Sequence, residues 1–178
     1  MKSKDYRPRL RGNTRIAYDN LIKEERRILV VGDIHAPFSL DGYLEFCQDI
    51  YARFNLNQVV FIGDILDNHY ASYHDTDPNG LGGQDELECA VEQVQEWARA
   101  FPVADVIIGN HDRMVMRKAF SSAVPKEWIK SYNEVLGTDW NWTERIVYDN
   151  VQYVHGEGGT AKTLVAIIIT LSYKIKVE

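Results

Sequence analysis

The chain has 178 residues, of which 45% are hydrophobic, 11% aromatic and 26% charged, and its net charge is −6. This length suits one domain with a sizeable core, and the composition excludes disordered, collagen-like and coiled-coil chains. Its two cysteines, Cys47 and Cys89, are too few for a disulfide scaffold. They indicate a reducing compartment, so we expect a cytoplasmic protein.

Positive charge is concentrated at the amino terminus. Residues 1–27 contain nine Lys and Arg against four Asp and Glu, whereas residues 28–178 contain eleven against twenty-two. We therefore expect residues 1–26 to form a solvated basic arm and residues 27–178 to form the domain. The acidic body argues against a broad nucleic-acid surface. No segment reads as a signal peptide or a membrane span, so no membrane association is expected.

Three short apolar runs indicate buried strands. They are Ile28 to Val31, Val59 to Ile62 and Val103 to Ile108, and a glycine follows each of them at Gly32, Gly63 and Gly109. The runs are rich in β-branched residues and show no alternation with polar residues. This pattern is typical of strands that are covered on both faces.

Helical periodicity separates these runs. Apolar residues recur about every 3.6 positions from Asp41 to Phe54 and from Asp85 to Phe101. A third helix is predicted from Pro125, with proline in its first turn, to Leu136, with Gly137 as its stop. Alternation of strands and helices predicts an α/β fold built from right-handed βαβ units around a mostly parallel sheet.

A hairpin and a long loop complete the pattern. Two further strand-like runs, Arg145 to Tyr148 and Val151 to His155, flank the pair Asp149-Asn150, which predicts a tight antiparallel turn. Residues 70–83 contain turn-forming residues throughout. Loops of that length in a compact domain are usually functional or mobile.

Polar residues collect directly after the predicted strands. They are Asp33 and His35 after the first, Asp64 and Asp67 after the second, Asn110, His111 and Asp112 after the third, and His155 after the hairpin. Ligands of open α/β sheets bind beyond the carboxyl ends of the strands, and carboxylates mixed with imidazoles suit Mn²⁺, Fe or Zn²⁺. A single Asp after a strand is more often a turn or capping residue. Four such motifs in order are very hard to reach by chance.

This set of motifs resembles that of the calcineurin-like metallophosphoesterases. The matching segments are Asp33-Ile34-His35, Gly63 to Asp67, Gly109 to Asp112 and Val154-His155-Gly156, within about residues 27 to 160. The resemblance implies a four-layer α/β sandwich with mixed sheets and two bound divalent metal ions, with Mn²⁺ favoured and Fe or Zn²⁺ as alternatives. It also implies hydrolysis of a phosphomonoester or phosphodiester, in a phosphorylated small molecule or a nucleic acid.

The resemblance further implies a ligand set. Asp33 and His35 are expected to hold the first metal, Asp64 to bridge both metals, and Asn110 and His155 to hold the second. A hydroxide bound between two metals would attack phosphorus in line.

The remaining site residues are expected to act on the substrate. By the same resemblance, His111 would face the phosphate beside Asn110 and protonate the leaving oxygen, with the Asp67 carboxylate orienting it. Arg113 is a further candidate for contacting phosphate, although a solvated helix face is an equal alternative. Asp112 is expected to support its loop rather than to bind metal.

The sequence departs from the family pattern at its end. The family's final Gly-His-x-His motif has no counterpart here, since no histidine follows His155, and residues 164–178 form a β-rich run of different character. We therefore expect a member with an incomplete C-terminal part. The alternative is a catalytically impaired fragment that serves as a metal-binding or interaction module. No stable protein partner is predicted.

Several alternatives concern single segments. Residues 156–163 nearly match the phosphate-cradling G-x-x-x-x-G-K-T motif, but Ala161 replaces its glycine and too little chain follows. His69 and His74 could line the cleft, with solvated loop positions as the default. Asn68 and Asp112 stand where protein phosphatases have Arg and Glu, which favours nuclease-like or small phosphodiesterase branches. The aromatic residues Tyr70, Tyr73, Trp140 and Trp142 fit packing better than base stacking.

Overall fold

The computed structural model describes residues 26–73 and 79–156. The expected basic arm up to residue 25, His74, the glycine-rich segment after Gly156 and residues 164–178 lie outside the described residues. The elements in chain order are β1 (Ile28–Val31), α2 (Tyr43–Arg53), β2 (Gln58–Phe61), the 3-10 helix η1 (His69–Ala71), α3 (Gly83–Ala100), β3 (Asp105–Ile107), α4 (Met114–Ser121), the 3-10 helix η2 (Lys126–Trp128), α5 (Tyr132–Leu136), β4 (Asn141–Thr143), β5 (Ile146–Tyr148) and β6 (Val151–Tyr153).

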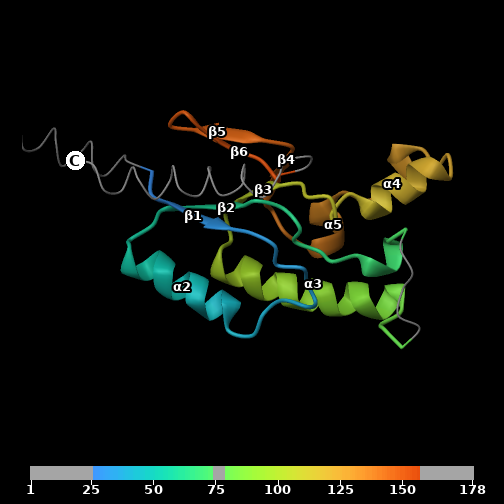
Figure 1. Ribbon diagram of the computed structural model, residues 1–178, viewed down its shortest axis with the longest axis horizontal. Coiled ribbons are helices and arrows are strands. Elements are labelled where there is room, and N and C mark those ends of the chain that lie inside the picture. The colour runs from blue at the N-terminus through green and yellow to red at the C-terminus, as the bar shows by residue number, and fades with distance from the viewer. Residues whose placement is uncertain (1–25, 74–78, 157–178) are drawn as a thin grey trace, which may run out of the picture.

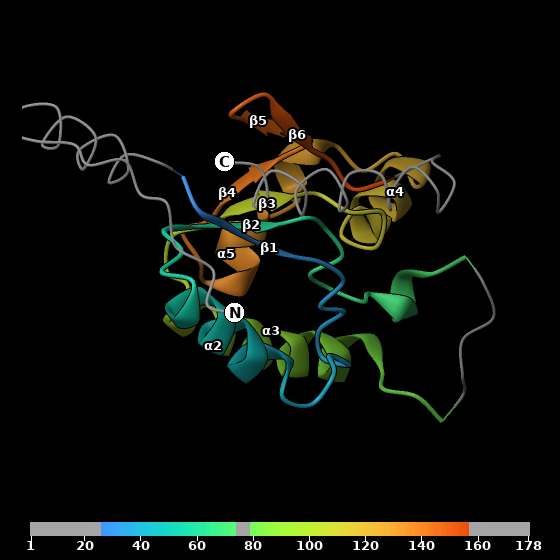
Figure 2. The ribbon, with the colours of Figure 1, turned by 60° about the vertical axis from the view of Figure 1, so that its left-hand side comes forward.

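The strands form two sheets. Strands β1, β2, β3 and β4 are neighbours in that order and all pair in parallel, whereas β5 and β6 form a separate antiparallel pair. Helices α2 and α3 lie on one side of the parallel sheet and the β5–β6 hairpin on the other (Figure 1). The view in Figure 2 shows α5 on the same side as α2 and α3. This arrangement confirms the expected α/β class, although each described sheet is purely parallel or purely antiparallel rather than mixed. The described residues account for three layers.

Both faces of the parallel sheet are buried, and this explains why its strands are uninterrupted apolar runs. Val31 and Phe61 pack with Trp97 of α3 in a large cluster on the helical side. Their chain neighbours point the other way, so Val60 of β2 packs with Tyr153 of β6 beneath the hairpin. Edge-to-face contacts of Phe61 and Tyr43 with Trp97 fill the centre of the helical side.

The third strand differs from its prediction. It begins at Asp105 rather than Val103, a residue that is 84% exposed. Asp105 is buried, and its carboxylate is satisfied there because it accepts hydrogen bonds from the side chains of Gln58, Asn141 and Tyr148. Strand β4 escaped prediction altogether, because its three residues contain no apolar run.

The predicted helix from Pro125 to Leu136 is wrong over most of its length. The segment holds the short η2 and then α5, which starts afresh after Ser131. Ser131 and Glu134 form a capping box, in which the Ser131 side chain accepts from the Glu134 N–H and the Glu134 carboxylate accepts from the Ser131 N–H. The stop at Gly137 is confirmed, with a left-handed φ of 64°.

The hairpin prediction is confirmed. Asp149 and Asn150 connect β5 and β6 and have φ values of 51° and 64°, which are typical of a two-residue hairpin turn. Within the described part of the chain, no helix is both long and apolar enough to cross a membrane.

Candidate metal centre

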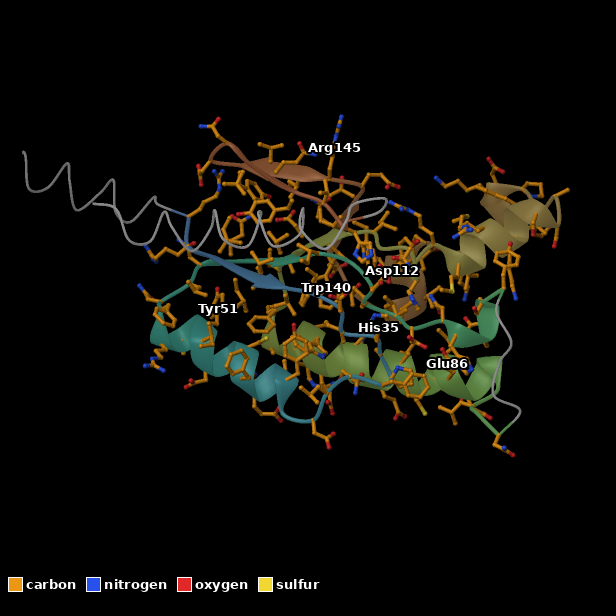
Figure 3. The ribbon with its side chains drawn as sticks, in the orientation of Figure 1. His35, Tyr51, Glu86, Asp112, Trp140 and Arg145 are labelled. Atoms are coloured by element: carbon orange, nitrogen blue, oxygen red, sulfur yellow. The ribbon has the colours of Figure 1, made fainter. Side chains whose placement is uncertain are left out.

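The polar motifs meet at one edge of the parallel sheet. Figure 3 shows His35 and Asp112 beyond the carboxyl ends of β1 and β3. The loops that follow β1 and β2 run side by side, because the His35 N–H donates to the Asp64 carbonyl oxygen at 2.9 Å. The Ala36 N–H donates to the Ile65 carbonyl oxygen at 2.8 Å in the same way. These bonds bring the side chains of the first two motifs within reach of each other.

The backbone is in the left-handed region at three candidate ligands. Asp33, His35 and Asp64 have φ values of 51°, 49° and 53°. This conformation costs a non-glycine residue roughly 1–2 kcal/mol, and such strained positions concentrate at functional sites. Here the bends bring side chains from separate strands together, since ligand atoms of Asp33, Asp64 and His155 lie within 4.8 Å of one another.

Asp64 lies at the middle of the cluster. Its Oδ2 is 3.3 Å from Nε2 of His155 and 3.8 Å from Nε2 of His35. Its Oδ1 accepts a hydrogen bond from the His111 backbone N–H at 2.9 Å. The Asp64 carboxylate therefore lies between one residue expected at the first metal, His35, and one expected at the second, His155.

His155 is held from both ring nitrogens. Its Nδ1 donates to the Ile62 carbonyl oxygen at 2.8 Å, and its Nε2 lies 2.8 Å from Oδ1 of Asn110. The hydrogen bond with Asp64 raises the pKa of His155 to about 9, although burial acts in the opposite direction. Burial also pushes the pKa of Asp64 upward, but the bonds from His155 and the His111 N–H outweigh it and hold the pKa below its usual value.

Two glycines allow this close approach. A Cβ on Gly63, whose φ is +102°, would lie 2.4 Å from Nδ1 of His155. A Cβ on Gly109 would lie 2.1 Å from Oδ1 of Asp64. Both positions must therefore lack a side chain if Asp64 and His155 are to keep their places.

Asp112 ties two of the loops together. It is 1% exposed, and its carboxylate accepts hydrogen bonds from the backbone N–H groups of Asp64 at 3.0 Å, Leu66 at 3.1 Å and Gly109 at 2.8 Å. Burial raises its pKa to about 6, against the effect of these bonds. This is the supporting role expected for Asp112, and it extends to the loop after β2.

Asp67 contacts His111 through both its main chain and its side chain. Nδ1 of His111 lies 2.6 Å from the backbone carbonyl oxygen of Asp67 and 3.6 Å from the carboxylate. The carboxylate instead bonds Nδ1 of His35 at 2.7 Å. The main-chain carbonyl of Asp67 thus makes the shorter contact with His111, and its carboxylate lies closer to His35 than to His111. One residue thus orients two imidazoles whose ring centroids are 4.6 Å apart.

Arg113 lies beside the cluster. Its guanidinium forms an ion pair with Glu144. Both residues line a pocket of about 330 Å³ together with His155. The expected contact between Arg113 and phosphate stays a prediction.

Sequence reasoning missed one buried carboxylate near the cluster. Glu86 is 1% exposed and accepts hydrogen bonds from both the backbone N–H and Nδ1 of His69. A signal for it exists in the sequence. Helical spacing places the acid Glu86 on the buried face of α3, together with Ala90, Val94 and Trp97.

The donor atoms fit a divalent metal. Carboxylate oxygens, imidazole nitrogens and the Asn110 amide oxygen converge at one edge, and such mixed sets suit Mn²⁺, Fe or Zn²⁺. Two groups of potential ligands lie there, Asp33 with Asp64 and His155, and His35 with Asp67 and His111. Both groups come from the expected motifs.

Comparisons with known proteins agree with the donor set. The family model described as calcineurin-like phosphoesterase matches residues 26–170, most of the chain. Searches of curated proteins and of solved structures found no significant match. The family implies a hydrolase that uses divalent metal ions and acts on phosphorylated substrates. With its motifs gathered at one sheet edge, the chain belongs to the calcineurin-like phosphoesterase family.

Proposed function

We propose that this chain hydrolyses a phosphomonoester or phosphodiester at a dinuclear metal site. The observation that carries the proposal is the buried Asp64 carboxylate, which lies between His35 and His155 at 3.8 Å and 3.3 Å. Asp33 and His35 would hold one metal, Asn110 and His155 the other, and Asp64 would bridge them. When bound, the two metals would supply a hydroxide nucleophile and neutralise charge on the phosphoryl oxygens.

His111 is the proposed proton donor to the leaving oxygen. Its Nδ1 is engaged by the Asp67 carbonyl oxygen, so its Nε2 is the nitrogen left for the substrate. The His111 side chain remains 27% exposed, and a substrate can therefore reach it. The Asp67 carboxylate holds His35, and its carbonyl holds His111, so both rings keep fixed orientations.

The choice of metal is also a proposal. Mn²⁺ is favoured, since the set is rich in carboxylate oxygen and contains imidazole but no thiolate. Fe and Zn²⁺ are the alternatives. A cytoplasmic location and the lack of a stable protein partner are proposed on the sequence alone, and fractionation of cells with co-purification would test them.

Turnover by the metal-loaded protein tests this function. The purified chain would be assayed with an aryl phosphate and a bis-aryl phosphodiester in the presence of Mn²⁺. His111→Ala should keep metal binding and lose roughly 10²–10⁴-fold in kcat, as expected for removal of a general acid. Asp64→Asn should lose both metal binding and turnover, whereas the exposed-site control Asp49→Asn should keep both. Unchanged rates in the first two variants would contradict the mechanism.

The alternative, a metal-binding or interaction module without catalysis, predicts a different pattern. Calorimetric titration would then show tight binding of about two metals per chain and no turnover of either substrate. Measurable turnover that depends on His111 would exclude this alternative.

A further inference from the structure

A second histidine–carboxylate pair lies next to the metal centre. Nδ1 of His69 donates to Oε2 of Glu86 at 2.8 Å, and the His69 backbone N–H donates to Oε1 at 2.9 Å. Both Glu86 oxygens are thus directed at one residue. Figure 3 shows Glu86 in the first turn of α3, on the side of the molecule that carries His35 and Asp112.

Burial of the Glu86 carboxylate costs free energy of desolvation. Its contacts with His69 therefore indicate a role for that histidine. The Glu86 side chain is 1% exposed, and a buried carboxylate is tolerated only when it is paired and hydrogen-bonded. The start of α3 favours negative charge through the helix dipole, but a solvent-exposed carboxylate would gain that benefit without the cost of burial. Burial adds one contact that an exposed carboxylate would lack, the hydrogen bond with the His69 ring.

His69 is anchored to the catalytic loops through its neighbours. Asp67, two residues earlier, bonds His35 and His111, and potential ligand atoms of Asp67, His69 and Glu86 lie within 4.8 Å of one another. Asn68 has a left-handed φ of 50° and donates from its side chain to the His111 carbonyl oxygen at 3.1 Å. These contacts therefore fix residues 67–69 to the metal centre.

One ring nitrogen of His69 remains available. Since Nδ1 is engaged by Glu86, a ligand can reach the ring only through Nε2, and the side chain is 28% exposed. The ring lies edge-on to Phe38, with centroids 6.3 Å apart, and Phe38 belongs to the loop that follows the first motif. His69, which directly follows the second motif, therefore faces the loop that follows the first motif.

We propose that His69 binds a phosphoryl oxygen of the substrate through Nε2–H and that Glu86 is its positioning residue. The inference rests on the proposed phosphoesterase function. Because Glu86 engages the Nδ1 side of the ring, the partly exposed Nε2 side is the one that the anionic substrate can reach. The His69–Glu86 pair would favour substrates in which a phosphoryl oxygen extends past the two metals toward η1, where His69 lies.

The decisive variant is His69→Asn. The shorter amide can still donate to Glu86, so the buried carboxylate keeps a partner, but Nε2 is removed. In the Mn²⁺-loaded protein we expect KM for an aryl phosphate to rise about tenfold, the usual size for one hydrogen bond to a charged group. The kcat should stay within about twofold, because the lost contact contributes equally to ground-state and transition-state binding. Metal stoichiometry and the unfolding midpoint should match the wild type.

A spectroscopic readout separates substrate contact from a structural role. In protein loaded with diamagnetic Zn²⁺, addition of inorganic phosphate should shift the ¹⁵N resonance of His69 Nε2. Glu86→Gln should weaken this response and raise KM in the same direction as His69→Asn. A structural role would move the unfolding midpoint of Glu86→Gln without any effect of phosphate on the His69 resonance.

Three results would overturn the inference. An unchanged KM in His69→Asn would show that His69 does not contact substrate. Loss of a bound metal in that variant would make His69 a metal ligand instead. A phosphate-induced shift of the His111 resonance without one at His69 would place the phosphate elsewhere. If the metal-loaded wild type neither binds phosphate nor turns over, the proposed function fails first and the inference falls with it.

Discussion

Nε2 of His155 lies 3.3 Å from Oδ2 of Asp64, although the two residues follow different strands in different sheets. This contact raises the pKa of His155 to about 9, so at neutral pH the ring of the metal-free protein carries a proton that a metal must displace. Metal affinity should therefore rise with pH below about 9, by up to tenfold per unit when one proton is released. Calorimetric titrations between pH 7 and pH 8.5, in buffers of different ionisation enthalpy, would count the proton. An affinity independent of pH, with no proton released, would contradict this assignment.

Gly63→Ala should disturb the metal centre through His155. The new Cβ would lie 2.4 Å from Nδ1 of His155 and 2.9 Å from the Gly109 Cα, so the imidazole must move. We expect at least a tenfold loss of metal affinity and a loss of about 2–4 kcal/mol in stability, from overpacking and from φ strain together. Gly42→Ala is the matched control, because its φ is also positive, at +77°, but no atom lies within 4 Å of the new Cβ. Equal effects of the two substitutions on metal affinity would argue against a specific role of the His155 contact.

Asp112→Asn should destabilise the fold more than a surface substitution. The carboxylate accepts from three backbone N–H groups, those of Asp64, Leu66 and Gly109. An amide offers one oxygen, and its NH₂ group would face a backbone donor. The expected loss is about 2–4 kcal/mol in the free energy of unfolding, measured by urea denaturation at pH 7. Asp49→Asn on the exposed side of α2 should change stability by less than about 0.5 kcal/mol. Similar losses in both variants would show that the three bonds contribute little.

The two thiols should differ sharply in reactivity. Cys47 is 3% exposed, and burial raises the pKa of its thiol to about 11, whereas Cys89 is exposed. At pH 8 the native protein should react rapidly with one equivalent of a disulfide reagent and with the second only after unfolding. Cys89→Ser should remove the rapid phase. Two rapid equivalents in the native protein would mean that Cys47 is accessible.

Sequence patterns predicted the elements whose residues repeat at a regular period. The helices near residues 43–53 and 83–100 and the first two strands match their predictions within a few residues, because burial of a helix face or of a whole strand leaves a clear signature. The third helix failed because the Ser131–Glu134 capping box begins a new helix where the apolar pattern suggested continuity. Strand β4 failed because it is polar and only three residues long.

The candidate site was partly readable for a different reason. The carboxyl ends of parallel strands share one edge, so residues such as Asp33 and Asp64 could be placed together from the order of motifs alone. The hydrogen-bond partner of each imidazole could not be predicted from the order of motifs. Whether the Asp67 carboxylate faces His35 or His111 depends on side-chain rotamers, and the bond from Glu86 to His69 joins segments whose spacing in the sequence carries no periodic signal.

The backbone at Asp33, His35 and Asp64 is already left-handed in the metal-free protein. The conformational free energy of forming the site is therefore spent during folding and not during metal binding. At roughly 1–2 kcal/mol per residue, the distortion is incurred when the chain folds and is offset by the buried layers on both faces of the sheet. An arriving ion then meets a backbone that is already bent, so binding requires only displacement of protons and small side-chain movements. The stability of the sheet thus lowers the reorganisation that metal capture requires, and a variant with a weakened core should bind metal less tightly even with every ligand intact.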